Sequence, residues 1–263
     1  MELNDNNYYS IEADREYLSY SQYKNFLSCE AAALARLDGW KEPKSTALLV
    51  GSYVHAAIEG DKAIKKFKTE NPEIFTQKGD LRSEFRQANL MIDTICNDKL
   101  MQMSLEGQKE VIVTGEFAGA VWKCKLDNLN QEKGFFSDLK TCASLSDKVW
   151  NNEKRAYISF VEAYGYIGQM ALYKEIICQS IGEYDPFMAI VTKENPPDKL
   201  VISFDPKLLE CELDKIRYNL SHVMGVKCGK LEPLSCGKCA YCRENKKLSR
   251  VYDFSEIYDL YWN

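Results

Sequence analysis

The chain of 263 residues has no long apolar run, no internal repeat and no low-complexity tract. A transmembrane helix needs about 20 consecutive, predominantly apolar residues, so we expect no membrane-spanning segment. The opening segment 1–10 is polar and acidic, whereas a signal peptide has a basic start followed by an apolar stretch. We therefore expect a cytoplasmic protein. With 45% hydrophobic residues, the chain is long enough to bury one substantial core.

An excess of positive charge is also missing. The chain has 34 Lys and Arg against 39 Asp and Glu, which gives a formal net charge of −5. This balance argues against a large nonspecific nucleic-acid footprint, although a few local lysines and a bound metal ion could still contact phosphates. Histidine is scarce, with only His55 and His222. His222 lies in no motif, so we interpret it as structural or exposed.

Cysteine, by contrast, is abundant, with ten residues. Structural disulfides are rare in the cytosol, so these thiols need another explanation. Five of them fall within expected helices or strands, where cysteine packs as a small hydrophobic side chain. These five, which we expect to be buried, are Cys96, Cys124, Cys142, Cys178 and Cys211.

Three further cysteines, Cys236, Cys239 and Cys242, are separated by two residues each. Such closely spaced thiols cannot all be packed away and are typical of soft-metal ligands. A fourth ligand is needed. Cys228 would complete a compact Cys₄ zinc site, whereas Cys29 would pin an N-terminal helix to the C-terminal tail. Four free thiols without a metal are the third alternative. In either metal site the expected role is structural.

The segment 110–141 is rich in β-branched and aromatic residues and contains two turn signals, at 118–119 and at 131–134. We therefore expect it to form three strands joined by two tight turns.

The second turn sets the register of the last two of these strands. If its centre lies between positions 132 and 133, Asp127 is opposite Asp138 and Lys125 is opposite Lys140. Directly opposed side chains lie about 5 Å apart, and like charges there are destabilising, so the two aspartates require a cation between them. Asp138 and Lys140 share one face of the sheet, while Leu139 points into the core.

Two carboxylates and a lysine in this arrangement suit phosphodiester hydrolysis. Mg²⁺ and Mn²⁺ are hard cations that prefer oxygen ligands. Such an ion neutralises a phosphate and lowers the pKa of a bound water, and Lys140 could offset the charge that develops in the transition state. The pattern predicts a metal-dependent phosphodiesterase, with a solvated strand edge as the alternative.

Two helical motifs flank the strands. A GSYVH segment ends in His55, and a QMALY segment runs from Gln169 to Tyr173, two residues one helical turn apart. Glu59 lies one turn after His55 on the same helix face and is a further candidate. Glu116, on the preceding strand, could assist the site or be exposed. Tyr173 could also serve the core.

In this order and spacing, over about residues 18–175, the motifs resemble the PD-(D/E)XK nuclease superfamily, and within it the RecE-like and RecB-like exonucleases, such as phage-type exodeoxyribonuclease VIII. The resemblance implies an α/β fold with a mixed central sheet flanked by helices. It implies that Mg²⁺ or Mn²⁺ is bound by His55, Asp127, Asp138 and the backbone carbonyl of Leu139. It assigns catalysis to Lys140 with both aspartates, and it puts Gln169 and Tyr173 beside the site.

The order of the cysteines resembles that of AddB-type iron–sulfur nucleases. In those proteins one cysteine before the nuclease core and three after it hold a [4Fe–4S] cluster. The matching residues here are Cys29, Cys236, Cys239 and Cys242. The last spacing is shorter than in that family. The resemblance favours a cluster, and zinc bound with Cys228 is the alternative.

The resemblance implies a metal-dependent DNA exonuclease that acts on double-stranded ends in recombination or repair, in a bacterium or a phage-infected cell. Expected partners are double-stranded DNA ends, a single-strand annealing protein and further copies of the chain in a homo-oligomer. Two alternatives stay open: a CRISPR-adaptation-type iron–sulfur nuclease, and a catalytically silent protein that binds DNA ends. Trp122 and Trp150 are candidates for stacking on an unpaired end, although most aromatic residues serve packing.

We expect one nuclease domain over residues 1–263. It would contain N-terminal helices in 18–110, the catalytic core in 110–205, and a helix with a cysteine-rich metal-binding tail in 206–263. The expected helices are 19–37, 46–58, 81–97, 156–180 and 206–225. The expected later strands are 187–192 and 200–204.

Overall fold

The computed structural model describes residues 1–42, 45–152 and 154–258. The chain divides into two compact units. One comprises residues 44–217, and the other comprises residues 1–43 with 218–263. Each unit is described by itself. The expectation of a single nuclease domain over 1–263 stays a prediction.

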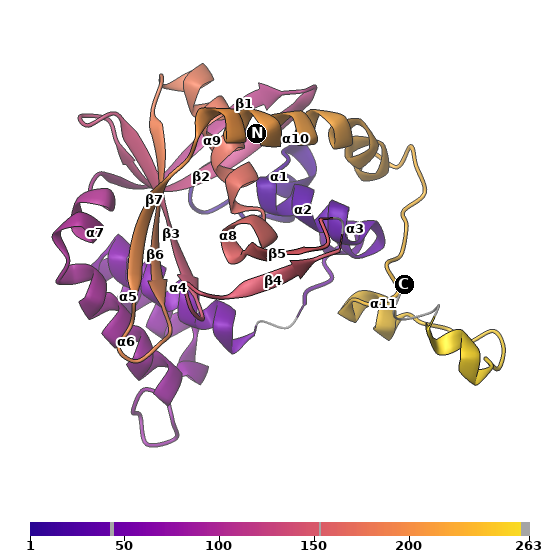
Figure 1. Ribbon diagram of the computed structural model, residues 1–263, viewed down its shortest axis with the longest axis horizontal. Coiled ribbons are helices and arrows are strands. Elements are labelled where there is room, and N and C mark those ends of the chain that lie inside the picture. The colour runs from indigo at the N-terminus through magenta and orange to yellow at the C-terminus, as the bar shows by residue number, and fades with distance from the viewer. Residues whose placement is uncertain (43–44, 153, 259–263) are drawn as a thin grey trace. The chain divides into compact units, whose positions relative to one another are not determined.

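The unit of residues 44–217 is built on a five-stranded sheet with the order β1-β2-β3-β6-β7 (Figure 1). Its strands are β1 (Gln108–Phe117), β2 (Ala120–Asn130), β3 (Phe135–Cys142), β6 (Asp185–Thr192) and β7 (Lys199–Ser203). β3 and β6 run parallel, and the other neighbouring pairs are antiparallel. The sheet is therefore mixed, as predicted.

Helices cover both faces of this sheet. On one face, α4 (Thr46–Glu59), α6 (Ser83–Cys96) and α7 (Lys99–Ser104) form a hydrophobic core with the sheet residues Leu139 and Val191. Successive strand residues point to opposite faces, and α9 (Tyr166–Ser180) packs on the other face, against β1, β2 and β6. The result is a layered α/β fold, which confirms the predicted fold class.

The remaining elements of this unit are shorter. They are α5 (Asp61–Glu70), the 3₁₀ turn η1 (Pro72–Ile74), the hairpin of β4 (Lys148–Asn151) and β5 (Ala156–Ser159), and α8 (Phe160–Ala163). The long helix α10 (Pro206–Lys227) begins in this unit and ends in the other.

The unit of residues 1–43 and 218–263 is helical. It contains α1 (Ile11–Glu16), α2 (Tyr20–Ser28), α3 (Glu30–Leu37), the end of α10, α11 (Ala240–Glu244) and the 3₁₀ turn η2 (Phe254–Glu256). Serine hydroxyls begin two of these helices, because Ser10 accepts from the Ala13 N–H and Ser19 from the Gln22 N–H. Cys29, Ala32 and Cys242 form a buried cluster, so the N-terminal helices and the cysteine segment share one core.

Most predicted elements are present within one to three residues, but two predicted long helices are wrong. The helix expected over 19–37 is two helices, because Cys29 adopts an extended backbone (φ −164°, ψ 107°) between α2 and α3. The helix expected over 156–180 begins as strand β5, and Gly165 (φ 68°) then separates α8 from α9. A left-handed backbone of this kind favours glycine. The sequence reading also missed α1, α5, α7 and β4.

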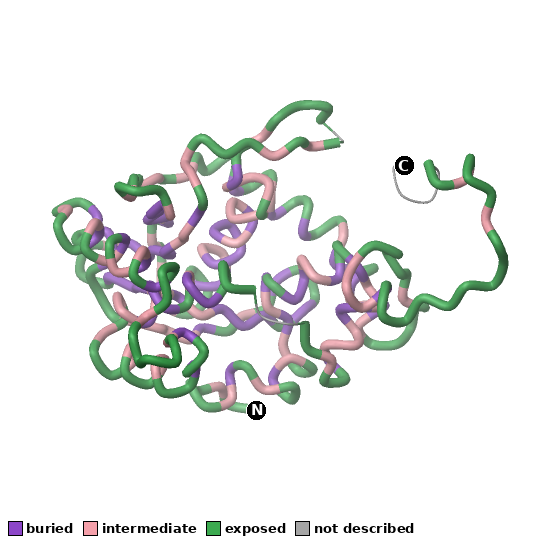
Figure 2. The backbone as a smooth tube through the Cα atoms, turned by 90° about the horizontal axis from the view of Figure 1, so that it is seen from below, coloured by how far each residue is buried: buried purple, intermediate pink, exposed green. Residues whose placement is uncertain are grey.

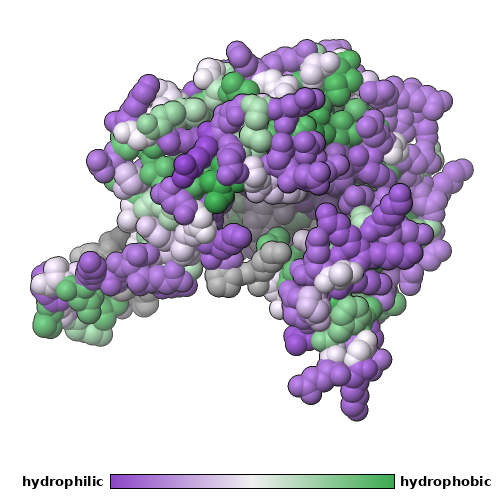
Figure 3. Space-filling view, turned by 180° about the vertical axis from the view of Figure 1, so that it is seen from behind, coloured by the Kyte–Doolittle hydropathy of each residue, from purple (hydrophilic) through white to green (hydrophobic). Residues whose placement is uncertain are grey.

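Buried residues concentrate in the strands and along the inner faces of the helices, while loops and the C-terminal segment are exposed (Figure 2). On the face shown in Figure 3, hydrophilic side chains predominate and hydrophobic ones form smaller groups among them. Within the described ranges, every helix is too short or too polar to cross a membrane.

Candidate functional site

The pairing of β2 and β3 ends at the predicted aspartates. The paired residues are Asn130–Phe135, Leu129–Phe136 and Asn128–Ser137. Continuing this register by one step places Asp127 opposite Asp138, as predicted, but the ladder stops before that pair. The strands therefore separate at a fork, and both carboxylates lie at its opening.

Lys125 does not complete the predicted pairing with Lys140. Its Nζ lies 2.8 Å from Glu110 Oε2, and its strand neighbour is Ile112 of β1. The prediction that Lys125 opposes Lys140 is wrong because β2 pairs with β3 only through Asn128–Asn130, so the two strands are already apart at Lys125.

Asp127 links the fork to helix α4. Its Oδ2 accepts a hydrogen bond of 2.7 Å from the Leu139 N–H and lies 3.4 Å from His55 Nδ1. Burial raises the pKa of Asp127 to about 6, His55 opposes this rise, and the neighbouring charge of Asp138 adds to it. Burial and Asp138 thus outweigh the opposing effects of His55, Lys140 and the Leu139 N–H on this carboxylate, which favours binding of a further cation.

Asp138 lies between Lys140 and Gln169. Its Oδ2 is 2.6 Å from Lys140 Nζ, and its Oδ1 accepts a hydrogen bond of 2.8 Å from Gln169 Nε2 on α9. Only 4% of the Asp138 side chain is exposed. Burial lowers the pKa of Lys140, but the charges of Asp138 and Asp127 outweigh it and raise the pKa above its usual value. Lys140 is therefore a fixed ammonium at neutral pH.

Tyr166, at the first position of α9, was not predicted from the sequence. Its ring centroid lies 4.8 Å from Lys140 Nζ, within the range of a cation–π contact. Burial raises the pKa of its hydroxyl. The available signal was its position, three residues before Gln169 and so on the same helix face.

A small cavity adjoins Asp127. Its volume is about 10 Å³, and its lining includes His55, Glu59, Glu110, Asp127 and Leu139, together with the cation Lys109. That is roughly the room that one water-sized particle occupies. The candidate Glu59 thus shares a cavity with His55 and Asp127. Glu110 was missed by the sequence reading.

The donors at the fork fit a hard divalent cation. Carboxylate oxygens and an imidazole nitrogen suit Mg²⁺ or Mn²⁺. A cation beside Asp127 would also offset the burial that raises the pKa of this carboxyl group. His55, Asp127 and Asp138 lie together at the fork, and their roles as metal ligands stay predictions. The role of the Leu139 carbonyl stays a prediction.

The other candidates lie in different surroundings. Tyr173 is buried in α9, at 9% exposure, which suits a packing role. The side chain of Glu116 is exposed, and its backbone exchanges hydrogen bonds with the Gln179 side chain. His222 is exposed and pairs with Glu30 at 2.6 Å, in agreement with its structural or exposed interpretation.

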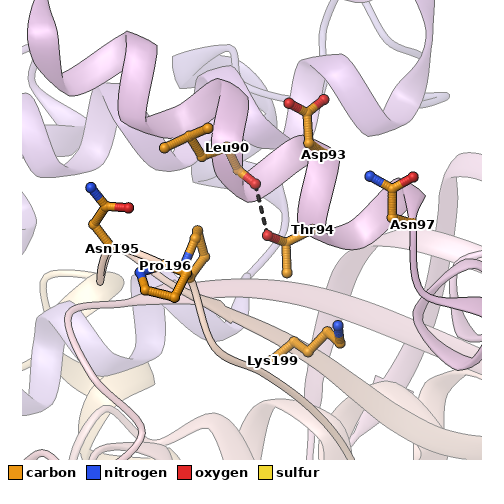
Figure 4. Close-up of a pocket in the computed structure, with 8 residues that line it drawn as sticks. Leu90, Asp93, Thr94, Asn97, Asn195, Pro196 and Lys199 are labelled. Carbon is orange, nitrogen blue, oxygen red and sulfur yellow. Dashed lines mark hydrogen bonds between the residues drawn. The ribbon is translucent and has the colours of Figure 1, made fainter.

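A roomier surface pocket, of about 400 Å³, lies elsewhere in the same unit. Figure 4 shows Leu90, Asp93 and Thr94 of α6, with Asn97 just after its end, facing Asn195, Pro196 and Lys199. None of the predicted site residues lines it. Size alone therefore does not identify the functional site.

The four cysteines of the predicted metal site come together in the other unit. The Sγ atoms of Cys29, Cys236, Cys239 and Cys242 all lie within 4.8 Å of one another. Cys228 is exposed and lies outside this group, so the structure selects Cys29 as the fourth thiol.

Backbone N–H groups surround these sulfurs. Cys236 Sγ accepts from the N–H groups of Lys238 and Cys239, at 3.4 and 3.3 Å. These bonds lower the pKa of Cys236 to about 6. A thiolate, which is the form that binds metals, is therefore favoured at Cys236.

The sulfur spacing tests which metal fits. A zinc ion with Zn–S bonds of about 2.3 Å in tetrahedral geometry sets its sulfurs about 3.8 Å apart. Cys29 and Cys242 are 3.5 Å apart, and Cys236 and Cys242 are 4.0 Å apart. In a [4Fe–4S] cluster each thiolate binds a different iron, so the sulfurs stand farther apart. This spacing fits one tetrahedral ion better than a cluster.

Two of the five cysteines expected in the core, Cys124 and Cys142, are buried. Cys96, Cys178 and Cys211 are exposed, so the prediction was wrong for them. Each of these three lies on a helix but on its outer face, which a coarse helix assignment cannot distinguish.

Comparison with solved structures finds a protein of Eubacterium rectale described as a "putative exonuclease". It is 40% identical, with 99% of this chain and 98% of that chain covered, at a TM-score of 0.93. A second structure, of SSO0001, is 13% identical and covers 75% of this chain and 86% of that chain, at a TM-score of 0.30, which is too low to support an argument. Comparison with curated proteins finds no match.

The family comparison covers most of the chain. The model of a PDDEXK-like domain of unknown function (DUF3799) matches residues 19–245, a range that includes both the fork and the four cysteines. The chain belongs to this PDDEXK-like family.

Proposed function

We propose that the protein is a metal-dependent DNA exonuclease that hydrolyses phosphodiester bonds at double-stranded ends. The observation that carries the proposal is the fork, where His55, Asp127, Asp138 and Lys140 meet as β2 and β3 separate. The similarity to the Eubacterium rectale protein described as an exonuclease supports it.

The residues of the fork have distinct roles in this proposal. His55, Asp127 and Asp138 would hold Mg²⁺ or Mn²⁺, which would neutralise the phosphate and acidify a bound water. Lys140, kept protonated by its neighbours, would stabilise the charge that develops on the phosphate oxygens.

One helix and one strand position the two carboxylates of the fork. Gln169 fixes Asp138 through its 2.8 Å hydrogen bond, so that Oδ2 faces Lys140. The Leu139 N–H fixes Asp127 in the same way from the strand itself. Because these partners sit on α9 and β3, the geometry is set by rigid elements rather than by loops.

The test uses linear duplex DNA labelled at the 5′ or the 3′ end, with a closed circular duplex as the substrate without ends. We expect Mg²⁺- or Mn²⁺-dependent release of nucleotides from the linear DNA only, and no release by Asp138→Asn. The matched control is Asp185→Asn, because the Asp185 side chain is 77% exposed and pairs only at the surface with Lys174.

The outcomes separate the alternatives. Cutting of the circle would indicate an endonuclease. Polarity and strand preference of the products would separate a CRISPR-adaptation-type nuclease from an end-resecting one. Binding of ends without cutting at any metal concentration would identify a catalytically silent end-binding protein and contradict the proposal. A role in recombination or repair, an annealing partner and a homo-oligomer are proposed on the resemblance alone.

We also propose a structural metal at Cys29, Cys236, Cys239 and Cys242. The resemblance favours a [4Fe–4S] cluster, whereas the sulfur spacing favours a single tetrahedral ion such as Zn²⁺. Metal analysis and visible absorbance of anaerobically purified protein distinguish the two. Iron with a brown absorbance would establish the cluster, and colourless protein with one zinc per chain would establish the single ion.

A further inference from the structure

The β4–β5 hairpin exposes a pair of large aromatic side chains. Trp150 and Tyr157 are direct cross-strand partners, and their ring centroids lie 5.2 Å apart in an edge-to-face arrangement. They are 51% and 67% exposed. Trp122, the other tryptophan considered for stacking, is fully buried and donates its indole N–H to the Phe117 carbonyl, which excludes it.

This exposure is not required by the hairpin's packing. Residues two apart on a strand share a face, so Val149 and Ile158 lie on the face opposite to Trp150 and Tyr157. Those two aliphatic side chains are half-buried, whereas the aromatic pair is exposed. An aromatic cross-strand pair stabilises a hairpin by up to about 1 kcal/mol, which smaller β-branched residues could also supply without exposing two rings.

The hairpin is joined at both ends to the elements that build the fork. β4 begins six residues after β3, the strand of Asp138 and Lys140, and β5 runs directly into α8. Figure 1 shows the hairpin beside α8, against which both strands pack. The chain then reaches α9, which carries Gln169.

The segment that follows the hairpin carries further aromatic rings close to Lys140. Tyr166 is 4.8 Å from Lys140 Nζ, and the ring of Tyr164 is 5.9 Å from that of Tyr166. Three extended residues and one helical turn separate Tyr157 from Tyr164, so their Cα atoms are at most about 17 Å apart. The hairpin and the fork are therefore linked by a short segment that carries exposed and half-buried aromatic residues.

The aromatic face also carries a positive charge. Lys148 shares it with Trp150 and is exposed, as is Arg155 after the turn of the hairpin. Exposed rings that are flanked by cations are the combination that binds single-stranded nucleic acid, because every base has a stackable face and every linkage carries a phosphate. A purely apolar protein partner would form no favourable contacts with these charges.

We propose that Lys148, Trp150 and Tyr157, here named the hairpin platform, bind unpaired nucleotides at the DNA end that is cut at the fork. The bases stack on Trp150 and Tyr157, and Lys148 contacts a phosphate. The platform thereby holds a frayed or single-stranded end in line with Lys140. This inference rests on the proposed nuclease function and adds the form of the DNA end that the site prefers.

The test measures binding by fluorescence anisotropy, with Ca²⁺ replacing Mg²⁺, to a duplex with a short unpaired tail and to a blunt duplex. Loss of one stacking ring costs roughly tenfold in affinity. We expect Trp150→Leu and Tyr157→Leu each to weaken binding of the tailed duplex by about that factor and of the blunt duplex by less than about twofold. Trp150→Phe should restore most of the affinity, because it keeps a ring.

The control is Tyr218→Leu, which removes an aromatic side chain that is 87% exposed on α10. It should change neither affinity, and the leucine variants should melt within a few degrees of the wild type, since the lost aromatic pair contributes at most about 1 kcal/mol. Equal loss with both duplexes, no loss with either, or failure of Trp150→Phe to restore binding would overturn the platform.

Parallel Mg²⁺ assays of wild-type cleavage separate the two proposals. Cleavage by the wild type with unchanged tailed-duplex binding by the leucine variants would reject the platform and keep the nuclease. Tail-specific loss of binding without any wild-type cleavage would keep the platform and reject the nuclease. Absence of any DNA binding would reject both.

Discussion

The fork and the cysteine cluster bring together metal-ligand side chains of different chemical kinds. At the fork, hard oxygen and nitrogen donors lie beside a small cavity, and burial raises the pKa of Asp127. In the cysteine cluster, four soft donors lie close together; backbone N–H groups lower the pKa of Cys236, whereas burial raises the pKa of Cys29 and Cys239. A site with open, undercompensated ligands suits a metal that must also bind substrate, whereas a closed set of four thiolates suits a metal that stabilises the fold.

The first way to test this contrast is to remove the ammonium at the fork. Lys140→Met should reduce cleavage by about 10³-fold, because the proposed role of this ammonium is to stabilise charge on the reacting phosphate. Lys125→Met, which removes another lysine paired with a carboxylate, at Glu110, should cost less than about tenfold. Initial rates on end-labelled duplex measure both. Similar losses would indicate that Lys140 only stabilises the fold.

The second test removes one thiol from the closed site. If the proposed metal is bound at the four cysteines, Cys29→Ser should release it and lower the free energy of unfolding by about 4 kcal/mol, since metal binding is coupled to folding. Cys228→Ser should change neither quantity, because Cys228 lies outside the cluster. Metal content and denaturant unfolding give the readout. Cleavage per folded molecule should stay at the wild-type rate, and its loss would contradict a purely structural role.

The third test uses pH on the metal-free protein. The pKa of Asp127 is raised from 3.8 to about 6 in the folded state, so between these values the folded protein binds more protons than the unfolded chain. The contribution of Asp127 to the free energy of unfolding should therefore fall by about 2 kcal/mol as the pH rises from 4 to 7, and it is measured as the difference between the wild type and Asp127→Asn.

Asp127→Asn should remove that decline, and saturating Mg²⁺ at pH 7 should recover part of the lost stability. Asp185→Asn serves as the matched control and should keep the wild-type slope. Urea titrations at several pH values measure it. A stability that rises with pH over this range would show that Asp127 is compensated without a metal.

The smallest expected effect concerns the support of Asp138. Gln169→Leu should reduce cleavage by about 10- to 100-fold, since hydrogen-bond partners of metal ligands have effects of this size. Gln179→Leu, on the same helix, should be close to wild type, because Gln179 binds the Glu116 backbone and Glu175 instead. Equal activities of the two variants would remove Gln169 from the site.

Features that a local turn sets could be predicted from the sequence, whereas features that depend on packing between distant segments could not. The register of Asp127 and Asp138 could be predicted because one tight turn at residues 131–134 fixes it. The helix expected over 19–37 failed at Cys29, since its extended backbone is imposed by packing with Cys242 and not by local propensity. Tyr166 and Glu110 were missed because their places beside Lys140 and Asp127 depend on how separate elements pack.

Local patterns in the chain were enough to predict the opposition of Asp127 and Asp138, because one tight turn sets that register, and the family resemblance added His55 and the α/β class. The folded structure was needed to see that β2 and β3 separate before the aspartates, that Cys29 rather than Cys228 joins the other three thiols, and that Trp150 is exposed while Trp122 is buried. Each of these depends on contacts between residues far apart in sequence, and their energies are set by packing and burial that no local pattern encodes.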